Sequence, residues 1–120
     1  MKKILIADDD PTVRMFYRDI LSEAGFEVSL AEDAAAALTR YQEVQPDLVV
    51  LDVNMPAGGG LSVYRRFRDT LAVAVPVIFI TGNSDKVNGL AGIPGVAVMK
   101  KPVAPDVLIS QIERILMSNE

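Results

Sequence analysis

Carboxylates, one hydroxyl and one amine form the part of this sequence that could carry out chemistry. Asp8 and Asp9 follow an apolar run, Asp52 and Thr81 each end one, and Lys101 follows another. Three carboxylates brought together repel, and at about 4 Å each pair costs roughly 4 kcal/mol at an effective dielectric constant of about 20. A divalent cation that prefers oxygen ligands would offset that repulsion, as would the ammonium of Lys101. The three aspartates, completed by water and a backbone carbonyl, would suit octahedral Mg²⁺.

Each of these residues also has a purely structural explanation. Asp10, followed by Pro11, is best explained as the N-terminal cap of a helix. For any one of the other residues, a cap or loop role explains its presence about as well as a chemical role does. Coincidence is a poor explanation for five such residues at the ends of four apolar runs. We therefore interpret the set as a candidate site.

The composition excludes several kinds of site. The chain has no cysteine and no histidine, which rules out thiol nucleophiles, disulfides, Ser-His-Asp triads and imidazole-bound zinc. Its 16 acidic and 12 basic residues give a net charge of −4, which weighs against direct nucleic-acid binding. The apolar runs are far shorter than the roughly 20 residues that a membrane span needs. No secretory signal is recognisable either, so we predict a cytoplasmic chain that does not enter a membrane.

Five short apolar segments, and the periodic segments between them, predict the elements that would position the site. The apolar segments are 4–7, 28–30, 48–51, 77–80 and 96–99. Most are continuous rather than alternating, which is typical of parallel strands buried on both faces. Helical spacing predicts helices between Pro11 and Gly25, between Asp33 and Pro46, over 61–71, and from Pro105 to Leu116.

The helical signal is weakest within 84–94. Its apolar residues are suitably spaced, but Gly89, Gly92 and Pro94 oppose a helix, so we expect a short or distorted one. Strand and helix alternate along the whole chain. This alternation predicts an α/β domain with a parallel sheet, helices on both faces and right-handed crossovers. Such sheets bind ligands at the carboxyl ends of their strands, which is where the candidate residues lie.

Four short motifs occur in order along the chain: Ile4-Leu5-Ile6-Ala7-Asp8-Asp9-Asp10, Asp52-Val53-Asn54-Met55-Pro56 with Gly60 beyond it, Thr81-Gly82 and Lys101-Pro102. In these motifs the chain resembles the receiver domain of two-component response regulators, and the resemblance covers nearly its whole length. Each motif is weak alone, but the ordered set is specific. The resemblance implies a doubly wound, flavodoxin-like five-stranded sheet of order 2-1-3-4-5 in a (βα)5 fold. It also implies one receiver domain over residues 1–120, with no output domain.

The resemblance further implies a metal site and a phosphoryl acceptor. Asp52 would accept the phosphoryl group as a carboxylate nucleophile. Asp8 and Asp9 would hold Mg²⁺, directly or, for Asp8, through a water, together with Asp52 and the backbone carbonyl of Asn54. The phosphoryl group would come from a phosphohistidine on a sensor histidine kinase or a His-containing phosphotransfer protein. That source is consistent with the absence of histidine from this chain.

By the same resemblance, Lys101 and Thr81 would act on the phosphoryl oxygens. Lys101 and Mg²⁺ would neutralise the equatorial oxygens during transfer. Thr81 would donate its hydroxyl only in the phosphorylated state, which would draw the following loop inward and bias a two-state element. The expected function is a phosphorylation-dependent switch that acts on a downstream protein target or in a phosphorelay. Its only catalysis would be its own phosphorylation and dephosphorylation.

Three departures from the family pattern concern its usual output surface. Val98 stands where relatives have an aromatic ring that swings inward, Val103 stands where they have Phe, and the segment 81–101 is shorter than expected. An alternative is therefore a receiver-fold interaction or dimerisation module, with a homodimer as one form. A remoter alternative is a carboxylate-nucleophile phosphatase of the haloacid-dehalogenase type. That chemistry needs a second Asp as general acid at the position where this chain has Asn54.

Overall fold

The computed structural model describes residues 1–55, 59–71, 73–82, 89–90 and 92–118. In chain order, the elements are β1 (Lys3–Ala7), α1 (Pro11–Glu23), β2 (Glu27–Ala31), α2 (Ala34–Val44), β3 (Leu48–Asp52), α3 (Gly59–Arg65), a π-helical turn η1 (Arg66–Thr70), β4 (Val77–Thr81), β5 (Val96–Lys100) and α4 (Pro105–Ser118). The sheet order is β2-β1-β3-β4-β5, and every neighbouring pair is parallel. The predicted doubly wound α/β fold and its strand order are confirmed.

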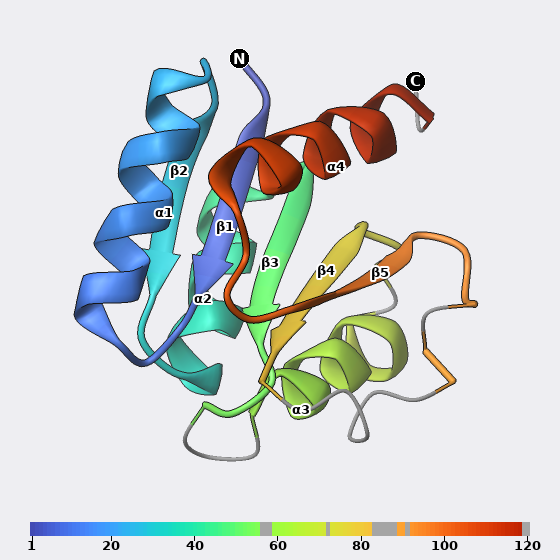
Figure 1. Cartoon of the computed structure of the whole chain (residues 1–120). Coiled ribbons are helices and arrows are strands. Elements are labelled where there is room, and N and C mark those ends of the chain that lie inside the picture. The colour runs from blue at the N-terminus through green and yellow to red at the C-terminus, as the bar shows by residue number, and fades with distance from the viewer. Residues whose placement is uncertain (56–58, 72, 83–88, 91, 119–120) are drawn as a thin grey trace.

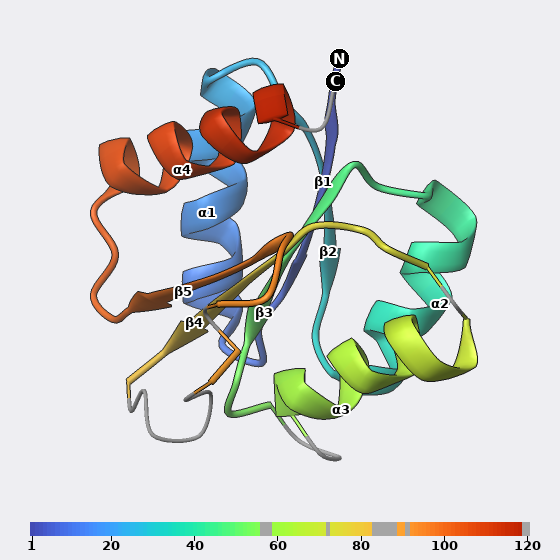
Figure 2. The ribbon, with the colours of Figure 1, turned by 90° about the vertical axis from the view of Figure 1, so that its right-hand side faces the viewer.

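The sheet separates two apolar clusters. Side chains alternate along each strand, so Ile4 and Ile6 face the cluster under α1 and α4, whereas Leu5 and Ala7 face the cluster under α2 and α3. Figure 2 shows the two helix pairs on opposite faces of the sheet. Because both faces are covered, β1, β3 and β4 are buried throughout or nearly so. Burial on both faces explains why their sequences read as continuous apolar runs.

Aspartates cap the first two helices, as predicted for Asp10. The side chain of Asp10 accepts a hydrogen bond from the N–H of Thr12 at 2.9 Å, and that of Asp33 accepts one from Ala36 at 2.8 Å. Each carboxylate satisfies an N–H group that the first helical turn leaves unpaired. These caps fix where α1 and α2 begin, and α1 begins shortly after Asp8 and Asp9 at the end of β1.

The third helix begins earlier and ends differently from its prediction. It starts at Gly59 rather than at residue 61, and after Arg65 it widens into η1, which closes with a bond from Leu71 N–H to the Arg66 carbonyl at 2.9 Å. Arg68 then donates to the carbonyls of Val73 and Val75, at 3.0 Å each. The guanidinium therefore satisfies two backbone acceptors that belong to no strand.

The weak segment before β5 is only partly described. Most of the helix expected within 84–94 lies outside the described residues, because 84–88 and 91 are not described. That helix therefore stays a prediction. The described neighbours, 89–90 and 92–95, form turns and a bend. Figure 1 shows β5 at the edge of the sheet, followed by the connection to α4. Among the helices described, none has the length and apolar content required to cross a membrane.

Candidate functional site

The candidate residues lie at or just beyond the carboxyl ends of their strands. Asp52 is the last residue of β3 and Thr81 the last of β4, while Asp8 directly follows β1. Bonds that continue the sheet pattern fix the flanking residues. The N–H of Asp8 donates to the Ala31 carbonyl at 3.1 Å, and that of Lys101 donates to the Thr81 carbonyl at 2.9 Å. The backbone of the sheet thus brings the predicted residues to one edge.

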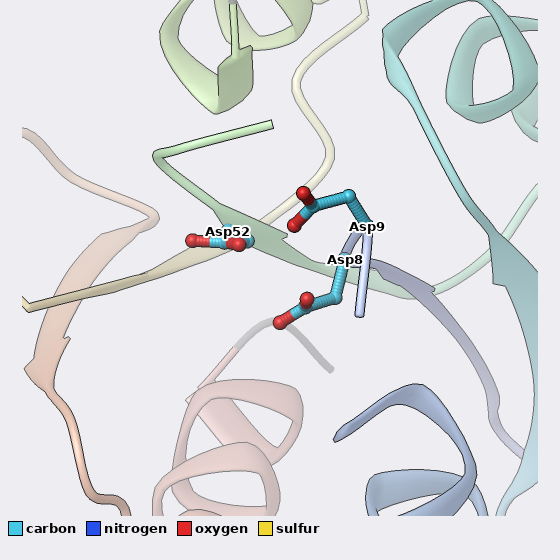
Figure 3. A group of neighbouring side chains, drawn as sticks. All are labelled: Asp8, Asp9 and Asp52. Atoms are coloured by element: carbon cyan, nitrogen blue, oxygen red, sulfur yellow. The ribbon is translucent and has the colours of Figure 1, made fainter. Parts of the chain in front are cut away.

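Three of these residues form a carboxylate cluster. Asp8, Asp9 and Asp52 each offer a carboxylate oxygen, and these oxygens lie within 4.8 Å of one another. Figure 3 shows the three side chains side by side where β1 and β3 end. Asp8 and Asp52 are buried, whereas Asp9 is exposed and leaves the cluster open to solvent.

Lys101 supplies positive charge to this cluster. Its Nζ lies 3.3 Å from Oδ1 of Asp52 and 3.9 Å from Oδ2 of Asp8. The two acidic side chains are each 3% exposed, while that of Lys101 is 35% exposed. One ammonium faces three carboxylates, so the fully ionised group retains two negative charges. That excess suits a divalent cation with oxygen ligands.

The surroundings of Asp8 oppose its ionisation. Burial raises the pKa of its carboxyl above the ordinary 3.8, and the charges of Asp52 and Asp9 raise it further. The N–H of Asp10, which donates to Oδ1 of Asp8 at 2.9 Å, and the ammonium of Lys101 act in the opposite direction. Desolvation is the largest of these effects, so the site holds a carboxylate at a free-energy cost.

Asn54 lies two residues beyond the end of β3, and Thr81 is the last residue of β4. The backbone N–H of Asn54 donates to Oδ1 of Asp52 at 3.1 Å, which ties the loop after β3 to Asp52. Thr81 is completely buried at the end of β4. Its strand, β4, lies between β3 and β5 in the sheet, so Thr81 lies between Asp52 and Lys101 along the edge.

The structure explains why position 60 is glycine, which the sequence motif alone did not. A Cβ atom at this position would lie 2.7 Å from the backbone oxygen of Asp52 and 3.2 Å from Cβ of Leu51. The start of α3 can pack against the end of β3 only because this residue has no side chain. The spacing from Asp52 identified Gly60 as part of the motif, and the close approach explains why the residue is glycine.

Sequence analysis did not identify two neighbours of the cluster, both on α1. Tyr17 is buried, and its pKa is raised by that burial and then by the charges of Asp8 and Asp52. Arg14 donates from Nη1 to the backbone carbonyl of Asp8 at 2.7 Å. Helical spacing placed both residues on α1, but no pattern in the sequence indicated which strand end their side chains would reach.

The two valines that depart from the family pattern lie on opposite faces of the sheet. Val98 packs partly buried against the cluster under α2 and α3. Val103 is buried in the cluster under α1 and α4. Both line a hollow of about 460 Å³ between β5 and the start of α4. The small side chains therefore leave unfilled space along this edge of the molecule.

The chain is similar to known proteins along nearly its whole length. A family model described as the response regulator receiver domain matches residues 4–113. The DNA-binding response regulator MtrA of Mycolicibacterium smegmatis is 32% identical over 99% of this chain and 52% of its own length. The response regulator MprA of Mycobacterium sp. (strain KMS) is 36% identical over 95% of this chain and 50% of its own length. The chain spans about half the length of these curated relatives.

Solved structures agree with this result. The crystal structure of a response regulator receiver domain protein from Clostridium thermocellum superposes with a TM-score of 0.88, at 28% identity over 99% of this chain and 97% of that one. The matched fold, the family model and the aspartates and lysine gathered at the strand ends lead to one conclusion. This chain belongs to the receiver domain family of two-component response regulators.

Proposed function

We propose that this chain is a phosphorylation-dependent signalling switch in which Asp52 accepts a phosphoryl group with the help of Mg²⁺. The observation that carries the proposal is the surroundings of Asp52. Its carboxylate belongs to the cluster with Asp8 and Asp9, and Nζ of Lys101 lies 3.3 Å from its Oδ1. Asp52 is thus a nucleophile that lies beside an ammonium group and beside carboxylates of the kind that bind Mg²⁺. This arrangement suits phosphoryl transfer, which depends mainly on positioning and charge stabilisation.

The cluster fits a hard divalent cation. Its donors are carboxylate oxygens, and with Lys101 they retain two negative charges when all are ionised. We propose that Asp8, Asp9 and Asp52 hold Mg²⁺, together with the backbone carbonyl of Asn54. When bound, Mg²⁺ would supply positive charge to the oxygens of the phosphoryl group.

The chain's own residues have distinct parts in the proposed transfer. A carboxylate oxygen of Asp52 forms a bond to phosphorus while the bond from phosphorus to a histidine nitrogen breaks. The electron pair of that bond stays with the imidazole, which leaves as a neutral ring when its other nitrogen already carries a proton. Lys101 places its ammonium against the phosphoryl oxygens, and Thr81 donates its hydroxyl to one of them once the aspartyl phosphate has formed.

The partners of the chain follow from the same chemistry. Response regulators partner with histidine kinases, and receiver domains are generally not classical enzymes. We propose that the donor is a sensor histidine kinase or a His-containing phosphotransfer protein, and that the phosphorylated chain acts on a protein target or in a phosphorelay. A cytoplasmic location and the lack of direct nucleic-acid contact stay predictions.

Labelling with a small phosphodonor tests the proposal without a partner protein. Acetyl phosphate or phosphoramidate with Mg²⁺ should add one phosphoryl group to the wild-type chain, detected by intact mass. Asp52→Asn should abolish the labelling, and chelation of Mg²⁺ should suppress it. Labelling that persists unchanged in Asp52→Asn would refute the assignment of the acceptor.

The hollow beside Val98 favours a second version of the function, in which the output surface responds in an unusual way. Val98 cannot make the aromatic swing that is expected of relatives, and it lines the hollow of about 460 Å³ between β5 and the start of α4. Amide spectra before and after phosphorylation separate the two versions. Shifts throughout β5 and the start of α4 support the switch, whereas modification of Asp52 without a response there supports an interaction or dimerisation module.

A further inference from the structure

Arg14 is linked to the acidic cluster by a bond that neither the motif nor the proposed mechanism uses. Arg14 lies in the first turn of α1, and its Nη1 donates to the backbone carbonyl of Asp8 at 2.7 Å. Its own N–H bonds to the Asp10 carbonyl at 2.9 Å. The guanidinium therefore reaches back over the start of the helix to the residue that follows β1.

The acceptor of this bond belongs to the peptide that joins Asp8 to Asp9. A peptide unit is planar, so the carbonyl of Asp8 and the N–H of Asp9 share one plane. Holding that carbonyl restricts the backbone rotation on both sides of the plane. The direction in which the side chain of Asp9 leaves the backbone depends on that rotation, and Asp9 is the exposed member of the cluster.

Asp8 is thus held at three separate points. Its N–H donates to the Ala31 carbonyl at 3.1 Å, and its Oδ1 accepts from the Asp10 N–H at 2.9 Å. Arg14 fixes the third point, the carbonyl. The first bond anchors the residue to β2 and the second orients its carboxylate, whereas the third sets the peptide that leads to Asp9.

We infer that Arg14 is a positioning residue for the acidic cluster, and that it sets the geometry in which Asp8 and Asp9 would take up Mg²⁺. The inference rests on the proposed function. Arg14 acts through the peptide plane, because its described bond to Asp8 is to the carbonyl oxygen, whereas Lys101 pairs with the carboxylates of Asp8 and Asp52. Residues that hold metal ligands in place in this way change metal affinity without touching the metal.

Arg40 provides a matched control. Both arginines line a groove of about 450 Å³ between α1, β2 and α2. Nε of Arg40 also donates to a backbone carbonyl near a strand end, that of Leu30 at 3.4 Å. That carbonyl belongs to β2 and does not lead to the cluster. Removing Arg40 changes the charge of the same groove but leaves the peptide between Asp8 and Asp9 held.

The test measures Mg²⁺ binding by isothermal titration calorimetry in the wild-type chain, Arg14→Gln, Arg14→Lys and Arg40→Gln. Arg14→Gln should weaken Mg²⁺ binding about 10-fold, in line with other residues that support metal ligands. Arg14→Lys should recover part of the loss, and Arg40→Gln should bind like the wild type. In the metal-free protein, the amide signals of Asp9 and Asp10 should shift in Arg14→Gln and stay in place in Arg40→Gln.

The outcomes separate this inference from the function on which it rests. Wild-type affinity in a folded Arg14→Gln chain overturns the inference alone, as does an equal loss in Arg40→Gln. A wild-type chain that binds no Mg²⁺ overturns the proposed metal site and the inference together. Urea unfolding identifies which variants fold. If Arg14→Gln does not fold, Arg14→Met, which keeps an apolar stem and lacks the donor, is judged by the same criteria.

Discussion

The ammonium nitrogen of Lys101 lies 3.3 Å from Oδ1 of Asp52, although Asp52 ends β3, Lys101 follows β5, and these two strands do not pair with each other. Lys101 follows β5, and its side chain reaches past the end of β4 to the end of β3. The same nitrogen is 3.9 Å from Asp8, beyond β1. One side chain therefore links three strand ends, and phosphorylation at Asp52 would change the charge that Lys101 faces.

Replacing Lys101 should separate metal binding from phosphoryl transfer. In Lys101→Ala the carboxylate cluster loses the cation that competes with Mg²⁺, so Mg²⁺ should bind at least as tightly as in the wild type. Labelling of Asp52 by acetyl phosphate should fall by roughly 100-fold or more, because a charge that stabilises the transferring group is gone. Calorimetry and intact mass measure the two effects. A variant that labels at the wild-type rate would exclude Lys101 from the transfer.

Asp8→Asn should stabilise the metal-free protein at neutral pH. Burial, the largest effect, raises the pKa of Asp8 above 3.8, so the native chain keeps this proton at pH values where the unfolded chain has lost it. The associated stability is fully present below the unfolded value and is lost as the pH rises through the folded value. A single stabilising substitution commonly adds about 0.5–2 kcal/mol to the free energy of unfolding.

Urea unfolding without Mg²⁺, from pH 7 down toward 4, checks this expectation. The advantage of Asp8→Asn should shrink as the pH falls. Asp47→Asn is the control, because the Asp47 carboxylate accepts a backbone bond from the N–H of Lys3 at 2.7 Å and should lose stability when neutralised. If Asp8→Asn is less stable than the wild type at pH 7, the buried charge is not the cost that we infer.

Mg²⁺ should stabilise the wild-type chain through the three-aspartate cluster. Binding to the native state alone raises the free energy of unfolding by about 2.7 kcal/mol at 100 times the dissociation constant. Asp9→Ala should remove most of this gain. The neighbouring Asp10→Ala should lose about 1 kcal/mol of stability, because Asp10 caps α1, yet keep the response to Mg²⁺.

Thermal unfolding with increasing MgCl₂ measures these responses. The comparison is between adjacent aspartates of one loop, so general effects of ionic strength apply to both variants. An equal Mg²⁺ response in Asp9→Ala and in the wild type would falsify the assignment of Asp9.

Gly60→Ala should disturb the end of β3 from behind. The new Cβ would meet the backbone oxygen of Asp52 at 2.7 Å, so α3 must move away from the strand. Overpacking of this kind typically costs about 1–3 kcal/mol. The displaced Asp52 should also be labelled more slowly.

Gly92→Ala is the matched control, because nothing lies within 4 Å of its added Cβ. Urea unfolding and labelling rates should differ between the two variants. Equal stability of Gly60→Ala and Gly92→Ala would contradict the prediction, because α3 would then move away from β3 at no cost in the free energy of unfolding.

The strands, the helices and the positions of the candidate residues could be predicted because they depend on local signals, whereas the strand order came from the resemblance to the receiver family. Continuous apolar runs located the strands, and Asp10 and Asp33 located the helix starts. The parallel sheet then placed the polar residues that follow the strands at one edge. What escaped prediction depends on contacts between distant segments. The approach of α3 to Asp52 and the reach of Arg14 to the Asp8 carbonyl exist only once the elements have packed.

The placement of Tyr17 gives the molecule an optical signal of its own. The chain has three tyrosines and no tryptophan. Tyr41 and Tyr64 pack on the α2 and α3 face of the sheet, whereas Tyr17 lies on the other face, within the electrostatic influence of Asp8 and Asp52. Ultraviolet absorption and emission of a phenol change with the charge around it. We therefore expect the proposed metal uptake and the proposed modification of Asp52 to change the ultraviolet signal of Tyr17 in the unlabelled protein.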